Sequence, residues 1–199
     1  MPNGQEVYEK IVALEEKRRI VQPYQKWLYA LQRYRTKLSS PLKTEISITG
    51  ICNQKCEHCS NGGGNKKGVL RLKLLKEILK WHPGYIVLTG GEPFLHPEID
   101  EIIYQVKSDN AFLRICTNGT LLSTKINIDF FEAMDENDII QISFDAADKE
   151  TYAKMRGSDN FDKVLTNIRS IKKRYPYINI ELHCVPTQYN ITQLTSIYR

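Results

Sequence analysis

Short apolar runs and longer amphipathic segments alternate along most of this chain. Runs rich in Ile, Val, Phe and Thr, bounded by Gly, Pro or Asn, are typical of strands. The predicted strands cover residues 45–49, 85–89, 112–117, 139–144 and 178–185. Between them, apolar residues recur every three or four positions, which predicts helices. The predicted helices cover residues 69–81, 97–107, 130–134 and 164–171, and a further one starts near residue 191.

This alternation predicts an α/β fold with a parallel sheet, because parallel neighbours need a crossover that is usually a helix. The N-terminal part of the chain has a different pattern. After a break at Pro23, an apolar stripe at helical spacing is formed by Trp27, Leu31, Tyr34 and Leu38. Proline interrupts helices, so Pro41 is expected to close this segment. We therefore expect a helical extension over residues 1–41 and a core domain over residues 42–199.

Composition narrows the class of protein. Of the 199 residues, 41% are hydrophobic and 26% are charged, which is ordinary for a soluble globular domain. No run approaches the roughly 18 apolar residues that a membrane span needs, and the polar N-terminus lacks the apolar core of a secretory signal. We expect a cytoplasmic location. The net charge of +5 comes without a nucleic-acid-binding motif, so the basic runs are read as solvated helix faces.

The cysteines carry the most specific signal. Their number, five, is odd and argues against a disulfide framework. Cys52, Cys56 and Cys59 follow the first predicted strand with the spacing C-x3-C-x2-C. Thiolates crowded in this way can converge on zinc or on an iron–sulfur cluster. A four-iron cluster held by three cysteines keeps one iron open to a ligand that is not protein. Cys116 and Cys184 fall within predicted strands, where free cysteine behaves as a small apolar residue.

The remaining distinctive motifs also follow predicted strands. They are Thr89-Gly90-Gly91-Glu92-Pro93, Thr117-Asn118-Gly119-Thr120, Ser143-Phe144-Asp145 and His183-Cys184-Val185-Pro186. Active sites of parallel α/β folds form at the carboxyl ends of the strands, so these motifs are expected to share one edge with the cysteines. Gly90 and Gly91 allow a ligand to approach the backbone closely. A flexible basic loop is expected over residues 62–68.

The cysteine triplet, the Gly-Gly-Glu-Pro run and their order resemble the radical S-adenosylmethionine (SAM) enzymes. The resemblance covers about residues 45–190, and Ser143-Phe144-Asp145 with Met155-Arg156-Gly157 resembles the peptide-modifying and molybdopterin-type branch. It implies a partial parallel (β/α) barrel of the radical SAM type. We count about five β/α units, so the sixth unit of the family's usual barrel is missing. Either the chain is truncated, or a helix or a partner covers the open edge.

The resemblance also implies a reaction and its cofactors. Cys52, Cys56 and Cys59 would ligate a [4Fe–4S] cluster whose fourth iron chelates SAM. An electron from a flavodoxin- or ferredoxin-like reductant would cleave SAM to a 5′-deoxyadenosyl radical, which abstracts hydrogen from a small-molecule or peptide substrate. Residues implied in SAM binding are Gly90, Gly91 and Glu92 for the ammonium group, Asn118 for the nucleoside, Ser143 for the ribose or methionyl part, Arg156 for the carboxylate and Val185 for the adenine. His58 would shield the cluster or pack near the adenine.

Other functions remain open at this point. A glycyl-radical activating enzyme uses the same cysteine spacing. A zinc-binding module would use the three cysteines with a histidine, although a second Cys/His pair at regular spacing is not evident. A degenerate barrel would bind the cluster without turnover.

Overall fold

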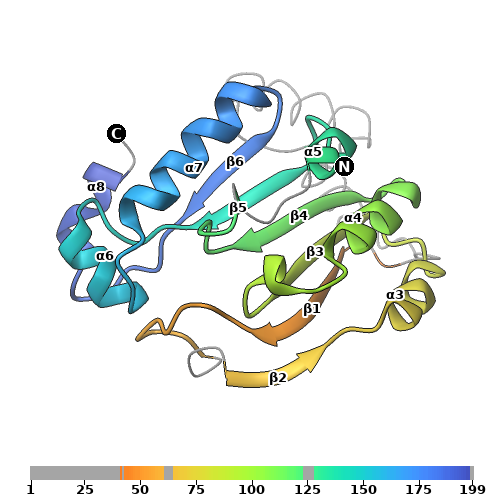
Figure 1. Cartoon of the computed structure of the whole chain (residues 1–199), viewed down its shortest axis with the longest axis horizontal. Coiled ribbons are helices and arrows are strands. Elements are labelled where there is room, and N and C mark those ends of the chain that lie inside the picture. Colours follow the sequence, from red (N-terminus) through yellow and green to blue (C-terminus); the bar gives the residue numbers. More distant parts are fainter. Residues whose placement is uncertain (1–40, 42, 61–64, 123–127, 198–199) are drawn as a thin grey trace, which may run out of the picture.

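The computed structural model describes residue 41 and residues 43–60, 65–122 and 128–197. Among these residues, one six-stranded sheet has the strand order β2-β1-β3-β4-β5-β6 (Figure 1). The strands are β1 (Lys43–Ile51), β2 (Asn65–Val69), β3 (Tyr85–Gly90), β4 (Phe112–Thr117), β5 (Ile139–Ser143) and β6 (Asn179–His183). Strand β1 and strands β3 to β6 are mutually parallel, whereas β2 pairs with β1 in the antiparallel sense. The predicted α/β class and its five parallel strands are confirmed.

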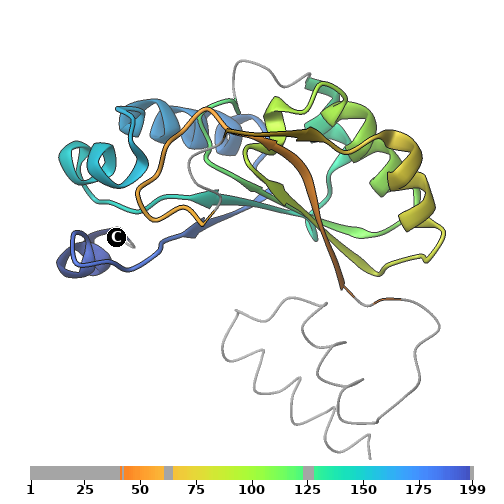
Figure 2. The ribbon, with the colours of Figure 1, turned by 90° about the horizontal axis from the view of Figure 1, so that it is seen from below.

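Helices connect the parallel strands and cover one face of the sheet (Figure 2). They are α3 (Leu72–Leu79), α4 (Ile99–Ser108), α5 (Ile128–Ala133), α6 (Lys149–Arg156) and α7 (Phe161–Arg174). The 3-10 turn η1 (Pro93–Leu95) follows β3, and the turn η2 (Ile191–Gln193) and the helix α8 (Leu194–Ile197) follow β6. Alternate strand residues point to this face and are buried, as the period of two requires. Ile48, Leu88, Ile115 and Ile142 are examples, and they pack in the same core as Val164 of α7.

The opposite face of the sheet carries a network of polar side chains. Its centre is Arg114 of β4, whose guanidinium donates hydrogen bonds to Tyr85 Oη (2.6 Å), Gln141 Oε1 (2.7 Å) and Glu181 Oε2 (2.8 Å). These residues come from four adjacent strands, so the network crosses most of the sheet. Helices cover one face of this open sheet and the Arg114 network lies on the other, as on the outside and the inside of a partial barrel.

Strand β2 corrects the sequence prediction at residues 62–68. We expected a flexible loop there, but Asn65–Val69 forms a strand beside β1, with Thr49 opposite Val69. The pairing is non-local and follows a register shift in β1, so the polar, glycine-containing sequence of the strand gave no signal for it. This sixth strand is antiparallel and adds no β/α unit, so it does not change the predicted count of about five β/α units.

Smaller differences concern element ends. Helix α3 begins at Leu72 rather than at residue 69, and α4 begins at Ile99, so Pro97 precedes it rather than occupying its first turn. Strand β6 ends at His183, which places Cys184 just beyond it. Helix α6 was not predicted. The helical extension predicted over residues 1–41 lies, except for Pro41, outside the described residues. In the described part of the chain no helix is long and apolar enough to cross a membrane.

Candidate functional site

The loops after β1, β3, β4, β5 and β6 meet at the carboxyl edge of the sheet, as their positions in the sequence predict. The segment after β3 continues beside β1, beyond a shift of register between Ser47 and Thr49. Gly91 N–H donates to Thr49 O and Glu92 N–H to Ile51 O, both at 2.7 Å. A Cβ on Gly90 or Gly91 would lie 2.2 Å from the oxygen of Thr49 or Ile51, respectively. Glycine is therefore required at both positions for the backbones to approach.

Glu92 joins two turns at this edge, its own after β3 and the one after β4. Its side chain is fully buried, and its carboxylate accepts hydrogen bonds from Thr117 Oγ1 (2.8 Å), Asn118 N–H (2.8 Å) and Phe94 N–H (3.2 Å). Burial raises the pKa of Glu92 to about 7, against the opposing effect of these donors and of Arg156. All the described donors around the carboxylate belong to the chain itself, so Glu92 acts here as the support of the neighbouring turns.

Asn118 connects the turn after β4 to the cysteine loop, residues 52–59. Its Nδ2 donates to Asn53 Oδ1 at 2.8 Å and lies 3.9 Å from the sulfur of Cys52, while its Oδ1 accepts from Thr120. Burial raises the pKa of the Cys52 thiol, the N–H of Gln54 opposes that rise, and Glu92 adds to it. The N–H of Gln54, 3.5 Å from this sulfur, and the Asn118 amide are thus placed to stabilise a thiolate at Cys52.

The other side of the cysteine loop rests on α6. Asp148 caps the helix by accepting from Thr151 N–H, and Gly157 ends it in the left-handed conformation. Glu57 N–H donates to Met155 O at 3.1 Å. A Cβ on Gly157 would lie 2.5 Å from Lys55 O, so the end of the helix and the loop are in close backbone contact. This contact brings Arg156 to the site.

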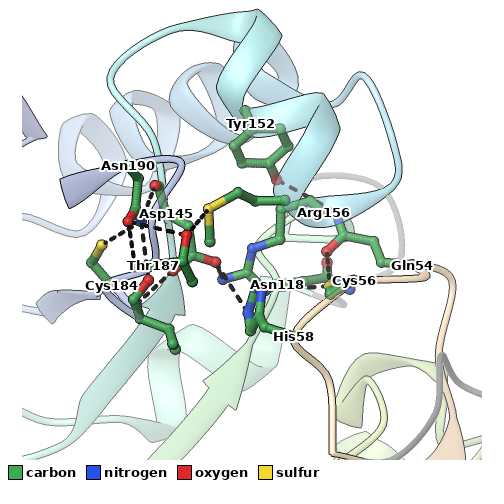
Figure 3. A network of polar contacts seen from close by, with 12 residues as sticks. Gln54, Cys56, His58, Asn118, Asp145, Tyr152, Arg156, Cys184, Thr187 and Asn190 are labelled. Atoms are coloured by element: carbon green, nitrogen blue, oxygen red, sulfur yellow. Dashed lines mark hydrogen bonds and ion pairs between the residues drawn. The ribbon is translucent and has the colours of Figure 1, made fainter. Parts of the chain in front are cut away.

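Arg156 lies between Asp145 and Cys56 (Figure 3). Its Nη2 forms an ion pair with Asp145 Oδ2 at 2.6 Å, and its Nη1 lies 3.7 Å from the Cys56 sulfur. Only 6% of Arg156 is exposed, so it is not the surface charge that is usual for an arginine at a helix end. Asp145 Oδ2 also lies 3.5 Å from His58 Nε2, and His58 Nδ1 is buried without a hydrogen-bond partner among the residues that the structure describes.

Asp145 itself is held by the segment that follows β6. Its Oδ1 accepts from Val185 N–H and its carbonyl from Asn190 Nδ2, both at 2.7 Å. Asn190 Nδ2 also contacts the sulfur of Cys184 at 3.4 Å. A carboxylate buried in this way is stable only with partners, and losing one partner of a buried ion pair costs about 3–5 kcal/mol.

The structure brings most of the predicted site residues to this one edge. Ser143 is half-buried at the end of β5, on the polar face of the sheet with Gln141. Val185 is 48% exposed, so it is not the core residue that is usual at a strand end. The sequence analysis assigned no role to Asp145, Gln54 or Asn190. Gln54 is buried and donates to Tyr152 Oη and Ser158 Oγ, which ties the cysteine loop to α6 and the residues after it.

Solved structures share this fold. SuiB from Streptococcus suis, bound to precursor peptide SuiA, superposes with a TM-score of 0.67 over 90% of this chain and 42% of SuiB, at 18% identity. SuiB bound to S-adenosylmethionine gives a TM-score of 0.64 at 17% identity, with the same coverage of both chains.

Curated relatives are similar in sequence. The mycofactocin maturase MftC of Mycobacterium tuberculosis is 25% identical over 169 residues, which are 82% of this chain and 42% of MftC. A protein described as a probable GTP 3′,8-cyclase, from Methanothermobacter thermautotrophicus, is 31% identical over 137 residues, 65% of this chain and 43% of that protein. The chain thus spans less than half the length of these relatives. The family model of the radical SAM superfamily matches residues 46–190, and the chain belongs to that superfamily.

Proposed function

We propose that this chain binds a [4Fe–4S] cluster through Cys52, Cys56 and Cys59, together with SAM, as the core of an enzyme that modifies a peptide. When bound, the cluster would deliver one electron that splits SAM into methionine and a 5′-deoxyadenosyl radical able to abstract hydrogen from the substrate. The residues of the chain would bind the cluster and SAM, orient them and exclude water from the reaction.

The observation that carries this proposal is the donor set at the carboxyl edge. All three cysteines are free thiols, and two of them have side-chain donors near their sulfurs, Asn118 at Cys52 and Arg156 at Cys56. Such donors favour the thiolate, the form that binds iron. Among the described residues no three metal-binding side chains are close enough to hold an ion. A cluster does not require such convergence, because each cysteine would ligate a different iron.

For SAM we propose the backbone of Gly90, Gly91 and Glu92 as the acceptor of the ammonium group. The buried Glu92 carboxylate supports this segment from behind, because its oxygens already accept hydrogen bonds from the chain. Asn118, Ser143, Arg156 and Val185 remain the proposed contacts to the nucleoside, the ribose or methionyl part, the carboxylate and the adenine. The exposed Val185 and the half-buried Ser143 have surface to offer a ligand.

The peptide substrate is proposed from the similarity to a relative named as a maturase. The likeness to SuiB, solved with a precursor peptide, agrees with it at the level of the fold alone. A flavodoxin- or ferredoxin-like protein is the proposed source of the electron.

Anaerobic reconstitution with iron and sulfide tests the proposal. We expect about four iron atoms per chain, an EPR signal of the reduced cluster that changes when SAM is added, and release of 5′-deoxyadenosine with dithionite. A variant with all three cysteines changed to alanine is the matched control and should take up no cluster. Tight binding of zinc without uptake of iron would overturn the proposal in favour of a zinc module. A cluster without a response to SAM would indicate a degenerate barrel.

A further inference from the structure

Asp145 connects three segments that are far apart in the sequence. It lies two residues after β5 and is completely buried. Its Oδ1 accepts the N–H of Val185 after β6, and its Oδ2 pairs with Arg156 at the end of α6 and approaches His58 in the cysteine loop. Figure 3 shows these side chains converging on Asp145. The proposed binding of the cluster and of SAM assigns no role to Asp145.

The geometry of Arg156 depends on this carboxylate. A long arginine side chain has many rotamers, and an ion pair with a buried carboxylate limits where its guanidinium can lie. Here Nη2 is 2.6 Å from Asp145 Oδ2, and the same guanidinium places Nη1 3.7 Å from the Cys56 sulfur. The backbone contacts between α6 and the cysteine loop set the distance that the side chain must bridge. Asp145 then decides which way the side chain turns.

The position of the guanidinium has an electrostatic consequence. Reducing a [4Fe–4S] cluster adds one negative charge, and hydrogen bonds or positive charge near the cysteine sulfurs favour the reduced form. A guanidinium held at Cys56 in a buried site is little screened by solvent. The same group released toward water would have a much weaker effect on the cluster.

We propose that Asp145 is a positioning residue of the cluster site, which holds Arg156 against the Cys56 sulfur and thereby raises the reduction potential of the cluster. The inference rests on the proposed binding of a cluster by the three cysteines. It goes further by assigning Asp145 a role and by giving Arg156 a function toward the cluster itself.

A double-mutant cycle on the reconstituted full chain tests this role. The midpoint potential is measured by EPR-monitored redox titration, without SAM, for the wild type, Asp145→Asn, Arg156→Gln and the double variant. Asp145→Asn keeps the size of the side chain but removes the charge that anchors the guanidinium. We expect Arg156→Gln to lower the potential in the wild-type background and to change it little in the Asp145→Asn background. The cycle cancels the direct effect of each charge on the cluster.

A second cycle controls for damage to the fold. Asp138 lies one residue before β5, at the other end of the same strand, and is a fully buried carboxylate that pairs with Lys107 at 2.8 Å. Asp138→Asn and Lys107→Gln break a comparable ion pair that has no contact with a cysteine. Their potentials should equal that of the wild type. If Arg156→Gln does not fold, Arg156→Lys replaces it, since it keeps the charge but loses the fork, and the same non-additivity is expected.

Several outcomes would overturn the inference. Shifts from Asp145→Asn and Arg156→Gln that simply add would show that the two residues act independently. An unchanged potential in Arg156→Gln would show that the guanidinium does not influence the cluster, and an equal shift in the Asp138 cycle would indicate a general effect of destabilisation. In these cases the wild type still assembles its cluster and the proposed function stands. Failure of the wild type to assemble a cluster overturns both.

Discussion

The N–H of Asn118 donates a 2.8 Å hydrogen bond to the buried carboxylate of Glu92. This bond ties the turn after β4 to the turn after β3. Asn118 in turn contacts the cysteine loop at Asn53, so the chain of bonds runs from Glu92 to the proposed ligand Cys52. Three segments that are separate in the sequence are thereby held as one rigid edge.

This arrangement gives the apoprotein a pH-dependent stability. Because burial raises the pKa of Glu92 from 4.5 to about 7, the folded chain retains a proton that the unfolded chain has lost between these values. The free energy of unfolding, compared with that of Glu92→Gln, should therefore fall as the pH rises from about 4.5 to about 7, by about 3 kcal/mol in total. Urea denaturation of both proteins across this range measures the difference. A difference that is flat or that rises with pH would contradict the prediction.

The close approach at Gly91 predicts a steric effect. In Gly91→Ala the new Cβ would meet the backbone of Ile51 at 2.2 Å, and a backbone atom cannot move aside cheaply. We expect a loss of about 3 kcal/mol in unfolding free energy, the upper end of overpacking costs, and impaired iron uptake. Gly68→Ala is the control, because its Cβ would meet nothing within 4 Å and only its φ of 149° opposes the change. Its cost should be smaller, about 1 kcal/mol, with iron uptake retained.

The cysteines should separate by function. Changing Cys52, Cys56 or Cys59 singly to alanine should reduce bound iron to a small fraction of the wild-type content, because each removes one of three ligands. Cys116→Ala should leave the iron content unchanged. Burial raises the pKa of the Cys116 thiol to about 11, and the residue lies on β4 away from the cysteine loop. Iron and sulfide assays on the anaerobically reconstituted variants decide the matter, and loss of iron in Cys116→Ala would point to a ligand role there.

The ion pair between Asp138 and Lys107 should contribute to the stability of the domain. Asp138 is fully buried and accepts the N–H groups of Leu113 and Asp135, both at 2.9 Å, while Lys107 also pairs with Asp135 at 2.8 Å. Asp138→Asn removes the charge and one of these acceptors but leaves Lys107 its second carboxylate, so we expect a loss of about 2 kcal/mol in chemical denaturation at neutral pH. The exposed pair of Lys80 with Glu77, also at 2.8 Å, is the control, and Glu77→Gln should cost less than about 0.5 kcal/mol. Equal losses would contradict this account.

The positions of the cysteine loop and of the Gly90-Gly91 turn, each directly after a strand, were predicted well from local sequence. The ligand role of the cysteines stays a prediction, while the structure shows that Gly90 and Gly91 are needed for close approach to the backbone of β1. The five parallel strands were predicted because apolar residues recur at their buried positions. Helix α6 was missed because its apolar periodicity is weak, although Asp148 and Gly157 are recognisable cap residues in the sequence.

Strand β2 and the contacts of Asp145 show what the sequence did not predict. Asn65–Val69 is a strand because β1 offers it an open edge, and Arg156 is buried because α6 packs on the cysteine loop. The sequence by itself determined the fold class, the three proposed metal ligands and the family. The tertiary structure alone decided that Asp145, Arg156 and Cys56 meet, because ion pairs and edge pairings join residues about 10 to 100 positions apart, and neither has a local pattern.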